Sequence, residues 1–259
     1  MVEDGVSGFF YNLGRHFGHK AVPAIRKSKL IWDGVAGSEE EAFRAEVALG
    51  AEMANELRAT VEIIEDQPTT LGLDDICQRL AARARDKRRT FRCAIFRDNV
   101  PNAIALPGAL LFFSNSLLEL CGRRPDELAF VAGHEMAHVL LGHTWDRMIN
   151  EAALRAASMA TARLGQLGVW LRQQGITLLR TAHERDLEFK ADELGFRLGV
   201  AAGFSPAGAI DLLERIQRLH PDRTALGHYL ASHPAAQDRA ARLQAVHQRI
   251  SPTSPTQNP

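Results

Sequence analysis

Cysteine is scarce in this sequence. Cys77, Cys93 and Cys121 are the full set, and no two of them have CxxC spacing. A secreted scaffold held together by disulfides carries an even and closely spaced set, so that class is excluded. The pattern favours a reducing compartment, in which each thiol packs as a small buried apolar side chain.

Long hydrophobic runs are also missing. A membrane-spanning helix needs about 18 or more apolar residues, and the most apolar segments, 103–120 and 152–179, are interrupted by Pro107-Gly108 and by arginines, respectively. Residues 1–20 lack the basic region, the apolar core and the cleavage site of a secretory signal. We therefore expect a cytoplasmic protein without a transmembrane helix.

An excess of charge of either sign is absent as well. Lysine and arginine together number 31, and aspartate and glutamate together number 31. A nucleic-acid-binding domain usually presents a net positive field, which this balance does not supply. We expect no nucleic-acid partner.

The chain is long enough for one large domain with a substantial core. Residues 1–40 mix aromatic and basic side chains, and residues 41–250 carry the periodic segments. Residues 251–259 form a Pro-, Ser- and Thr-rich tail that we expect to be disordered. Residues 9–32 would suit peripheral contact with an anionic membrane, although packing of these aromatics on the main domain is the preferred interpretation.

Local patterns predict a mainly α-helical α+β fold. The segments with helical periodicity or capping signals are 38–64, 74–85, 116–121, 125–148, 151–180, 181–198, 205–219 and 239–250. Residues 90–98 alternate and are rich in β-formers, so they predict a strand. Residues 102–114 predict a second extended piece, which Pro107-Gly108 divides so that Ala109–Phe113 forms a short strand of its own.

One stretch carries chemistry. "GHEMAHVLLGH", Gly133 to His143, contains the HExxH pattern at His134, Glu135 and His138. A spacing of four places both imidazoles on one face of a helix, where they reach a single zinc ion. Glu135 then projects beside the metal and is able to take a proton from a bound water. The alternative is a pair of core histidines satisfied by hydrogen bonds, with Glu135 exposed.

A catalytic zinc site needs a third protein ligand and leaves one position for water. The metzincin spacing would require a histidine at position 144, which is Thr144. His143 lies five residues after His138, and on a continuous helix about 500° of rotation points it away from the metal. We expect it to be a polar residue, or one that contacts a ligand without binding the metal itself. A gluzincin-type glutamate is available at Glu188, with Asp192 one turn later to accept a histidine N–H. Without the histidines, this acidic pair would be a charged surface stripe.

Four segments in order resemble the zinc metallopeptidase family that includes HtpX, the Oma-type mitochondrial proteases and the CaaX prenyl endopeptidase. The matching segments are "NAIALPGALLFFSNSLLEL", "GHEMAHVLLGH", "EFKAD" and "SHPAAQDRAARL". The resemblance covers roughly residues 45–247. Two departures stand out: Ala109 replaces the second glycine of the PGG turn, and the membrane spans of HtpX-like members are missing.

The resemblance implies a gluzincin metallopeptidase fold, with the HExxH motif on the active helix and an edge strand of a small sheet beside it. It implies one Zn²⁺ per chain, held by His134, His138 and Glu188. Glu135 would be the catalytic base.

The resemblance also assigns supporting residues. Asp192 would contact a ligand histidine, and Arg239 would lie near the metal. His233 would act in catalysis by stabilising the oxyanion, or would occupy the fourth zinc position in a latent form. His228 and Tyr229 are weaker candidates for that role.

These features predict a zinc-dependent metalloendopeptidase that cleaves extended or unfolded polypeptide, and we expect it to act in protein quality control. We expect Ala109, Leu110, Leu111, Phe112 and Phe113 to bind substrate as an added β-strand. One alternative is a latent zinc-binding protein with a chaperone-like or interaction role, and another is hydrolysis of a non-peptide amide. The oligomeric state is not predicted.

Overall fold

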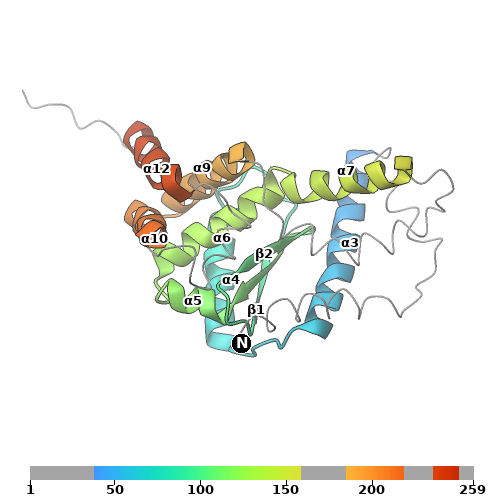
Figure 1. Cartoon of the computed structure of the whole chain (residues 1–259), viewed down its shortest axis with the longest axis horizontal. Coiled ribbons are helices and arrows are strands. Elements are labelled where there is room, and N and C mark those ends of the chain that lie inside the picture. Colours follow the sequence, from blue (N-terminus) through green and yellow to red (C-terminus); the bar gives the residue numbers. More distant parts are fainter. Residues whose placement is uncertain (1–37, 159–184, 219–235, 251–259) are drawn as a thin grey trace, which may run out of the picture.

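The computed structural model of this chain describes residues 38–158, 185–218 and 236–250. Within them, a three-stranded sheet lies among helices (Figure 1). The elements are α3 (Glu39–Thr60), α4 (Gln67–Ala81), β1 (Arg92–Phe96), β2 (Ala103–Leu106), β3 (Leu110–Ser114), α5 (Asn115–Leu120), α6 (Pro125–Leu140), α7 (His143–Ser158), α9 (Arg185–Ala201), α10 (Pro206–Arg218) and α12 (Ala236–Ile250). The predicted extension of residues 1–40 lies almost entirely outside this part, and the tail lies wholly outside it. The domain boundaries therefore stay predictions.

The expected fold class, mainly helical with a small sheet, is confirmed. Among the described helices, none is long and apolar enough to cross a membrane.

Helix starts follow from capping chemistry. Ser38 and Glu41 form a reciprocal capping box at the start of α3, as the serine followed by acids predicted. The start of α4 was predicted at Asp74 and is wrong. The Asp66 side chain accepts a hydrogen bond from the backbone N–H of Thr69, and Pro68 is tolerated in the first turn, so the helix begins at Gln67.

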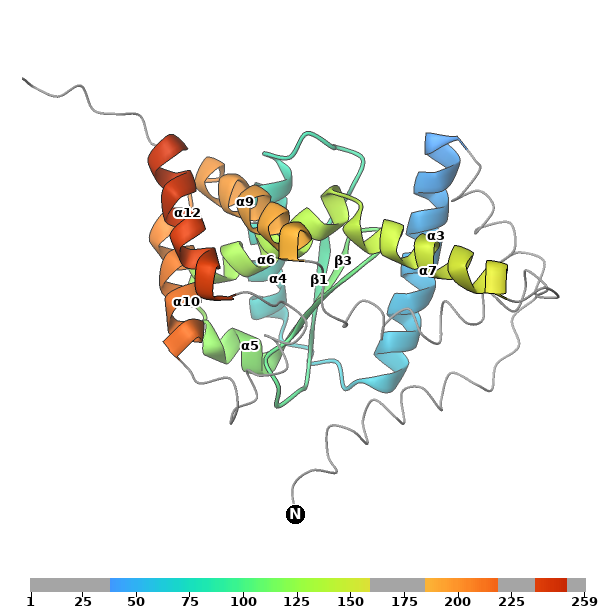
Figure 2. The ribbon, with the colours of Figure 1, turned by 45° about the horizontal axis from the view of Figure 1, so that its top comes forward.

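Helices cover both faces of the sheet. Figure 2 shows the strands between α3 on one side and α4 with α6 on the other. Along β3, Leu111 and Phe113 join the core cluster of α4 and α6, whereas Phe112 joins that of α3. Burial on both faces explains why β3 is a continuous apolar run rather than an alternating one.

The substrate-strand prediction for Ala109–Phe113 is wrong in its geometry. The strand order is β1-β3-β2, so β3 is the central strand. It pairs in parallel with β1 and antiparallel with β2, and its main-chain groups are therefore used on both sides. A substrate strand cannot be added to β3, and β2 is the edge that lies next to α6.

The turn that joins β2 to β3 is tight and unusual. Gly108 has φ +76° and Ala109 has φ +70°, both in the left-handed region. A Cβ on Gly50 of α3 would lie 1.7 Å from the carbonyl oxygen of Pro107, so α3 approaches the turn through bare backbone. The Gly108 N–H donates to Glu46 Oε1 at 3.2 Å. The PGG turn of the family that this segment resembles therefore has a conformational reason, and Ala109 adopts the left-handed conformation at a cost of about 1–2 kcal/mol.

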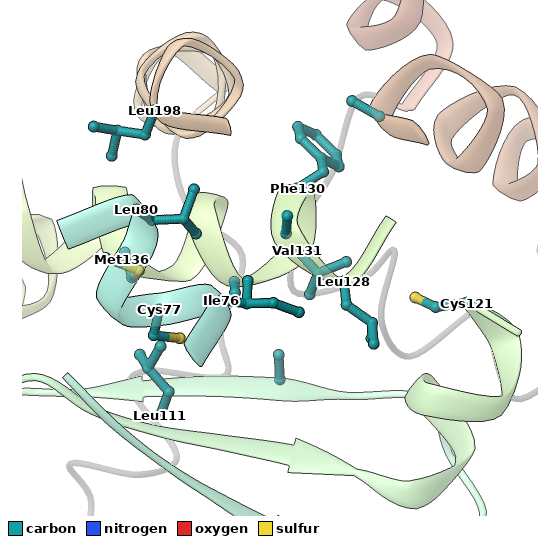
Figure 3. Close-up of a cluster of buried hydrophobic side chains, with 14 of the residues drawn as sticks. Ile76, Cys77, Leu80, Leu111, Cys121, Leu128, Phe130, Val131, Met136 and Leu198 are labelled. Carbon is teal, nitrogen blue, oxygen red and sulfur yellow. The ribbon is translucent and has the colours of Figure 1, made fainter. Parts of the chain in front are cut away.

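The larger core cluster joins the sheet to α4, α6 and α9. Figure 3 labels side chains from these elements, together with Cys121 at the end of α5, that meet in it: Ile76, Cys77, Leu80, Leu111, Cys121, Leu128, Phe130, Val131, Met136 and Leu198. Cys77 and Cys121 are fully buried, as expected of small apolar side chains, and Cys93 is half-buried. Burial raises the pKa of the Cys121 thiol to about 12, so this thiol stays protonated near neutral pH and contributes to packing rather than to chemistry.

Candidate metal centre

Helix α6 places the HExxH motif deep in the protein. His134, Glu135 and His138 have exposed fractions of 0%, 3% and 2%. The helix begins at Pro125 and has two acids in its first turn, as predicted from the sequence. Glu127 in that turn pairs with Arg215 of α10, which ties the start of α6 to a neighbouring helix. The motif is therefore carried by a fixed element.

Helix α9 crosses α6 directly beside the motif. A Cβ on Gly195 would lie 2.6 Å from the carbonyl carbon of Gly133 and 2.6 Å from the backbone nitrogen of His134. A Cβ on Gly133 would lie 2.9 Å from the carbonyl oxygen of Gly195. The two helices thus touch through backbone at this point. The crossing brings Glu188 and Asp192, both on α9 and both buried, against the histidines of α6.

Two histidines and one glutamate converge. His134 Nε2 lies 3.4 Å from Glu188 Oε2, and His138 Nε2 lies 3.2 Å from Glu188 Oε1. The two Nε2 atoms are 3.1 Å apart. One donor atom from each residue lies within 4.8 Å of the others. A buried carboxylate and two imidazole nitrogens aimed at one point suit a divalent metal ion.

The electrostatics of the cluster favour a cation. Burial alone would lower the pKa of His134, but the carboxylates of Glu188 and Asp192 raise it to about 9. The pocket therefore attracts positive charge, which a proton supplies when no metal ion competes for the nitrogens.

Behind the cluster, Asp192 holds His134. The His134 Nδ1 lies 2.9 Å from Asp192 Oδ1. Arg239 of α12, 1% exposed, donates to both oxygens of the same carboxylate, at 2.7 Å from Nε and 2.6 Å from Nη2. Burial would raise the pKa of Asp192, but the charge of Arg239 and the His134 hydrogen bond hold it below its usual value. An ionised acceptor on Nδ1 directs Nε2 toward Glu188.

His143 does not lie where the prediction of one continuous helix placed it. The predicted helix over 125–148 is broken: α6 ends at Leu140, Gly142 adopts φ +77°, and α7 begins at His143. His143 is 8% exposed, and its Nδ1 lies 3.2 Å from the Nδ1 of His138. The prediction that His143 points away from the metal face was wrong because it assumed a continuous helix, whereas the expectation that it contacts a ligand without binding the metal stays a prediction.

Comparison with known proteins agrees with this arrangement. The sequence model of peptidase family M48 matches residues 68–247, which include every residue of the cluster described above. The chain belongs to peptidase family M48. The expected resemblance to Oma-type proteases is confirmed, and the family together with the buried His-His-Glu cluster supports a metal cofactor.

Three relatives illustrate the similarity. The mitochondrial metalloendopeptidase OMA1 of Schizosaccharomyces pombe is 30% identical over 184 residues, which is 68% of this chain and 52% of the relative. The β-barrel assembly-enhancing protease of Yersinia pestis is 25% identical over 230 residues, 82% of this chain and 46% of the relative. The metalloprotease LoiP of Escherichia coli is 28% identical over 148 residues, 55% of this chain and 57% of the relative. This M48 chain therefore spans about half the length of these curated relatives.

Some of the site residues predicted from the sequence lie in the described part of this M48 chain, and others lie outside it. The structure brings His134, His138 and Glu188 together, with Asp192 and Arg239 behind them. Glu135 follows His134 on the same buried helix. His233, His228 and Tyr229 lie outside the described residues, so their roles stay predictions.

Sequence reasoning missed the two glycines of the helix crossing. Gly133 and Gly195 each sit inside a helical segment, where glycine is unfavourable by roughly 0.5–1 kcal/mol relative to alanine. A glycine inside each of the two predicted helices that carry site residues was the feature of the sequence that could have revealed the crossing. It indicates a close backbone approach, although it does not reveal the partner.

Proposed function

We propose that this chain is a zinc-dependent metalloendopeptidase. The observation that carries the proposal is the buried cluster of His134, His138 and Glu188, next to Glu135, in a chain of peptidase family M48. Two histidines and a glutamate are a known ligand set of catalytic zinc sites that leave a position for water. Zinc bound there would polarise the scissile carbonyl and make water a stronger nucleophile near neutral pH.

Residues of the chain would transfer the proton, orient a ligand and stabilise the developing charge. Glu135 takes a proton from the attacking water and passes it to the leaving amine. Asp192, held by Arg239, keeps His134 in one tautomer and one orientation. His233 remains a candidate for stabilising the developing negative charge on the carbonyl oxygen.

Substrate binding is proposed along β2 rather than β3. The Ser114 N–H donates to the Asn102 carbonyl at 2.9 Å, so alternation in the antiparallel ladder points the main-chain groups of Ala103 and Ala105 away from β3. Main-chain pairing of this kind selects an extended polypeptide and reads little of its sequence. This supports cleavage of unfolded segments, in keeping with a quality-control role.

Replacing Ala105 with proline tests this binding mode. The outward N–H would be lost while the β2–β3 hydrogen bonds remain, because proline is tolerated where the N–H faces away from the sheet. We expect a raised KM for an unfolded protein substrate, with zinc content and thermal stability close to wild type. An unchanged KM in a folded, zinc-loaded variant would reject β2 as the substrate strand.

The peptidase activity itself is tested with Glu135→Gln and an unfolded protein substrate. The variant keeps its zinc, because Glu135 is outside the ligand set, and we expect its cleavage to be lost. Glu193→Gln, a half-exposed acid on α9, is the matched control and should cleave normally. Equal activity of wild type and Glu135→Gln would reject the mechanism.

The two alternatives are not favoured. A latent interaction protein and a hydrolase of non-peptide amides would both use the same cluster, but the relatives that match this chain are named proteases and metalloendopeptidases.

A cytoplasmic location is part of the proposal, as is peripheral membrane contact through residues 9–32. One relative is a mitochondrial protein by name, so location requires cell fractionation. Liposome flotation of the full chain and of a truncation at about residue 38 tests the membrane contact. Equal flotation of the two proteins would reject contact through the extension.

A further inference from the structure

The chain changes direction between the end of α6 and the start of α7, and this turn brings a histidine to the metal centre. Gly142 has φ +77°, a conformation that glycine adopts without strain. The Asp146 N–H donates to the Gly142 carbonyl at 2.8 Å, which closes the first turn of α7 on this glycine. His143 is therefore held at the first position of a new helix, beside the last turn of α6.

The contact between His143 and His138 has a defined geometry. Their Nδ1 atoms are 3.2 Å apart, and the rings meet edge to face with centroids 5.1 Å apart and planes at 70°. Both side chains are buried, with exposed fractions of 8% and 2%. Two nitrogens at this distance in a buried setting form a hydrogen bond only if one carries a proton and the other does not.

The metal centre decides which nitrogen carries the proton. His138 Nε2 faces the cluster, 3.2 Å from Glu188 Oε1 and 3.1 Å from His134 Nε2, which leaves Nδ1 on the outer side. A neutral imidazole that binds a metal through Nε2 has its proton on Nδ1 and donates it. His143 Nδ1 is then the acceptor, and His143 carries its own proton on Nε2.

The two ligand histidines are thus supported in different ways. His134 donates to the ionised Asp192, which Arg239 holds in place. His138 meets a neutral imidazole instead. Hydrogen bonds to an ionised acceptor are roughly twice as strong as those between neutral groups, so of these two contacts the one between His134 and Asp192 is the stronger.

We propose that His143 is a positioning residue of the metal centre, whose Nδ1 accepts the Nδ1–H of His138 and fixes the tautomer and ring direction in which His138 presents Nε2. The proposal rests on the zinc site of the proposed function. It accounts for the third histidine of the segment from Gly133 to His143, to which the ligand set assigns no role.

Zinc affinity measured by competition with a coloured chelator tests the proposal on the full chain. His143→Ala should bind zinc on the order of 10-fold more weakly, as expected when a partner behind a ligand is removed. His143→Asn should recover most of the affinity, because its amide oxygen stands near the position of Nδ1 and accepts the same proton. Thr144→Ala, a neighbouring residue with an exposed fraction of 2%, is the matched control for local packing and should bind as wild type does.

A spectroscopic readout separates positioning from general structural support. In the zinc-loaded wild type and in His143→Asn, the Nδ1–H of His138 should give a hydrogen-bonded proton resonance, which His143→Ala should lose. Wild-type affinity in His143→Ala would overturn the proposal. Equal weakening in His143→Ala and His143→Asn would also overturn it. Failure of the wild type to bind zinc would reject the proposed function itself, whereas a zinc-loaded, active wild type with an unaffected His143→Ala rejects only the role of His143.

Discussion

Replacement of Gly195 by alanine should disturb the metal centre without touching a ligand. The added methyl would lie 2.6 Å from two backbone atoms of α6, the carbonyl carbon of Gly133 and the nitrogen of His134. Carbon atoms in contact prefer about 3.5–4.0 Å, so α6 and α9 must separate by roughly 1 Å. Backbone cannot rotate out of the way as a flexible side chain does.

Two opposing effects keep the change in stability small. Overpacking of this kind costs about 1–3 kcal/mol, whereas removing a glycine from a helix interior returns roughly 0.5–1 kcal/mol. The change in ligand geometry is not compensated in this way. Glu188 and Asp192 move with α9, and a displacement of about 1 Å reduces catalysis on the order of 100-fold.

The assay combines urea unfolding, zinc competition and kcat/KM with an unfolded protein substrate. Gly195→Ala should lose about 1 kcal/mol of unfolding free energy, bind zinc 10- to 100-fold more weakly, and lose most activity. Gly199→Ala is the matched control, because it lies one turn further along α9 and an added Cβ there has nothing within 4 Å. It should be as stable as wild type or more so, and fully active. Wild-type zinc affinity and activity in Gly195→Ala would refute the conclusion that this crossing sets the ligand geometry.

The remaining predictions concern the turn, the buried ion pair and the third ligand. Ala109→Gly should raise the free energy of unfolding by about 0.5–1 kcal/mol, because the left-handed conformation at φ +70° suits glycine; urea unfolding measures it, and a less stable variant would contradict it. Arg239→Met should destabilise by about 3 kcal/mol, at the low end for breaking a buried pair because His134 still contacts Asp192; a thermal scan showing wild-type stability would exclude this ion pair as a major contributor. Glu188→Ala should lose its zinc, and full zinc stoichiometry after dialysis would remove Glu188 from the ligand set.

Local chemistry made much of the site predictable. HExxH spacing places two imidazoles on one helical face, and Glu188 with Asp192 repeats that spacing on a second helix. Both segments are helical in the structure, so residues four apart in the sequence lie on one face of each helix, as predicted. The meeting of the two helices was inferred from the need for a third ligand, and the backbone contact that allows it was not visible in either segment alone.

Other errors came from features that local patterns do not encode. The break at Gly142 interrupts a segment whose apolar periodicity continues across it, so a continuous helix was predicted and His143 was misplaced. The strand after the turn was expected to be an edge, but strand order depends on pairing between segments distant in the chain. The apolar run of this strand is typical of burial on both faces, but it does not show which strands pair with it.

The placement of Arg239 on α12 has a consequence for the order of events during biosynthesis. The guanidinium that steadies Asp192 is separated by 105 residues in the chain from the His134 that Asp192 contacts. While the nascent chain is being made, α6 and then α9 leave the ribosome before the residue that neutralises their buried carboxylate exists. The carboxylate of Asp192 therefore acquires its buried cationic partner only after α12 has been synthesised and docked, so the fixed orientation of His134 depends on one of the last described helices of the chain.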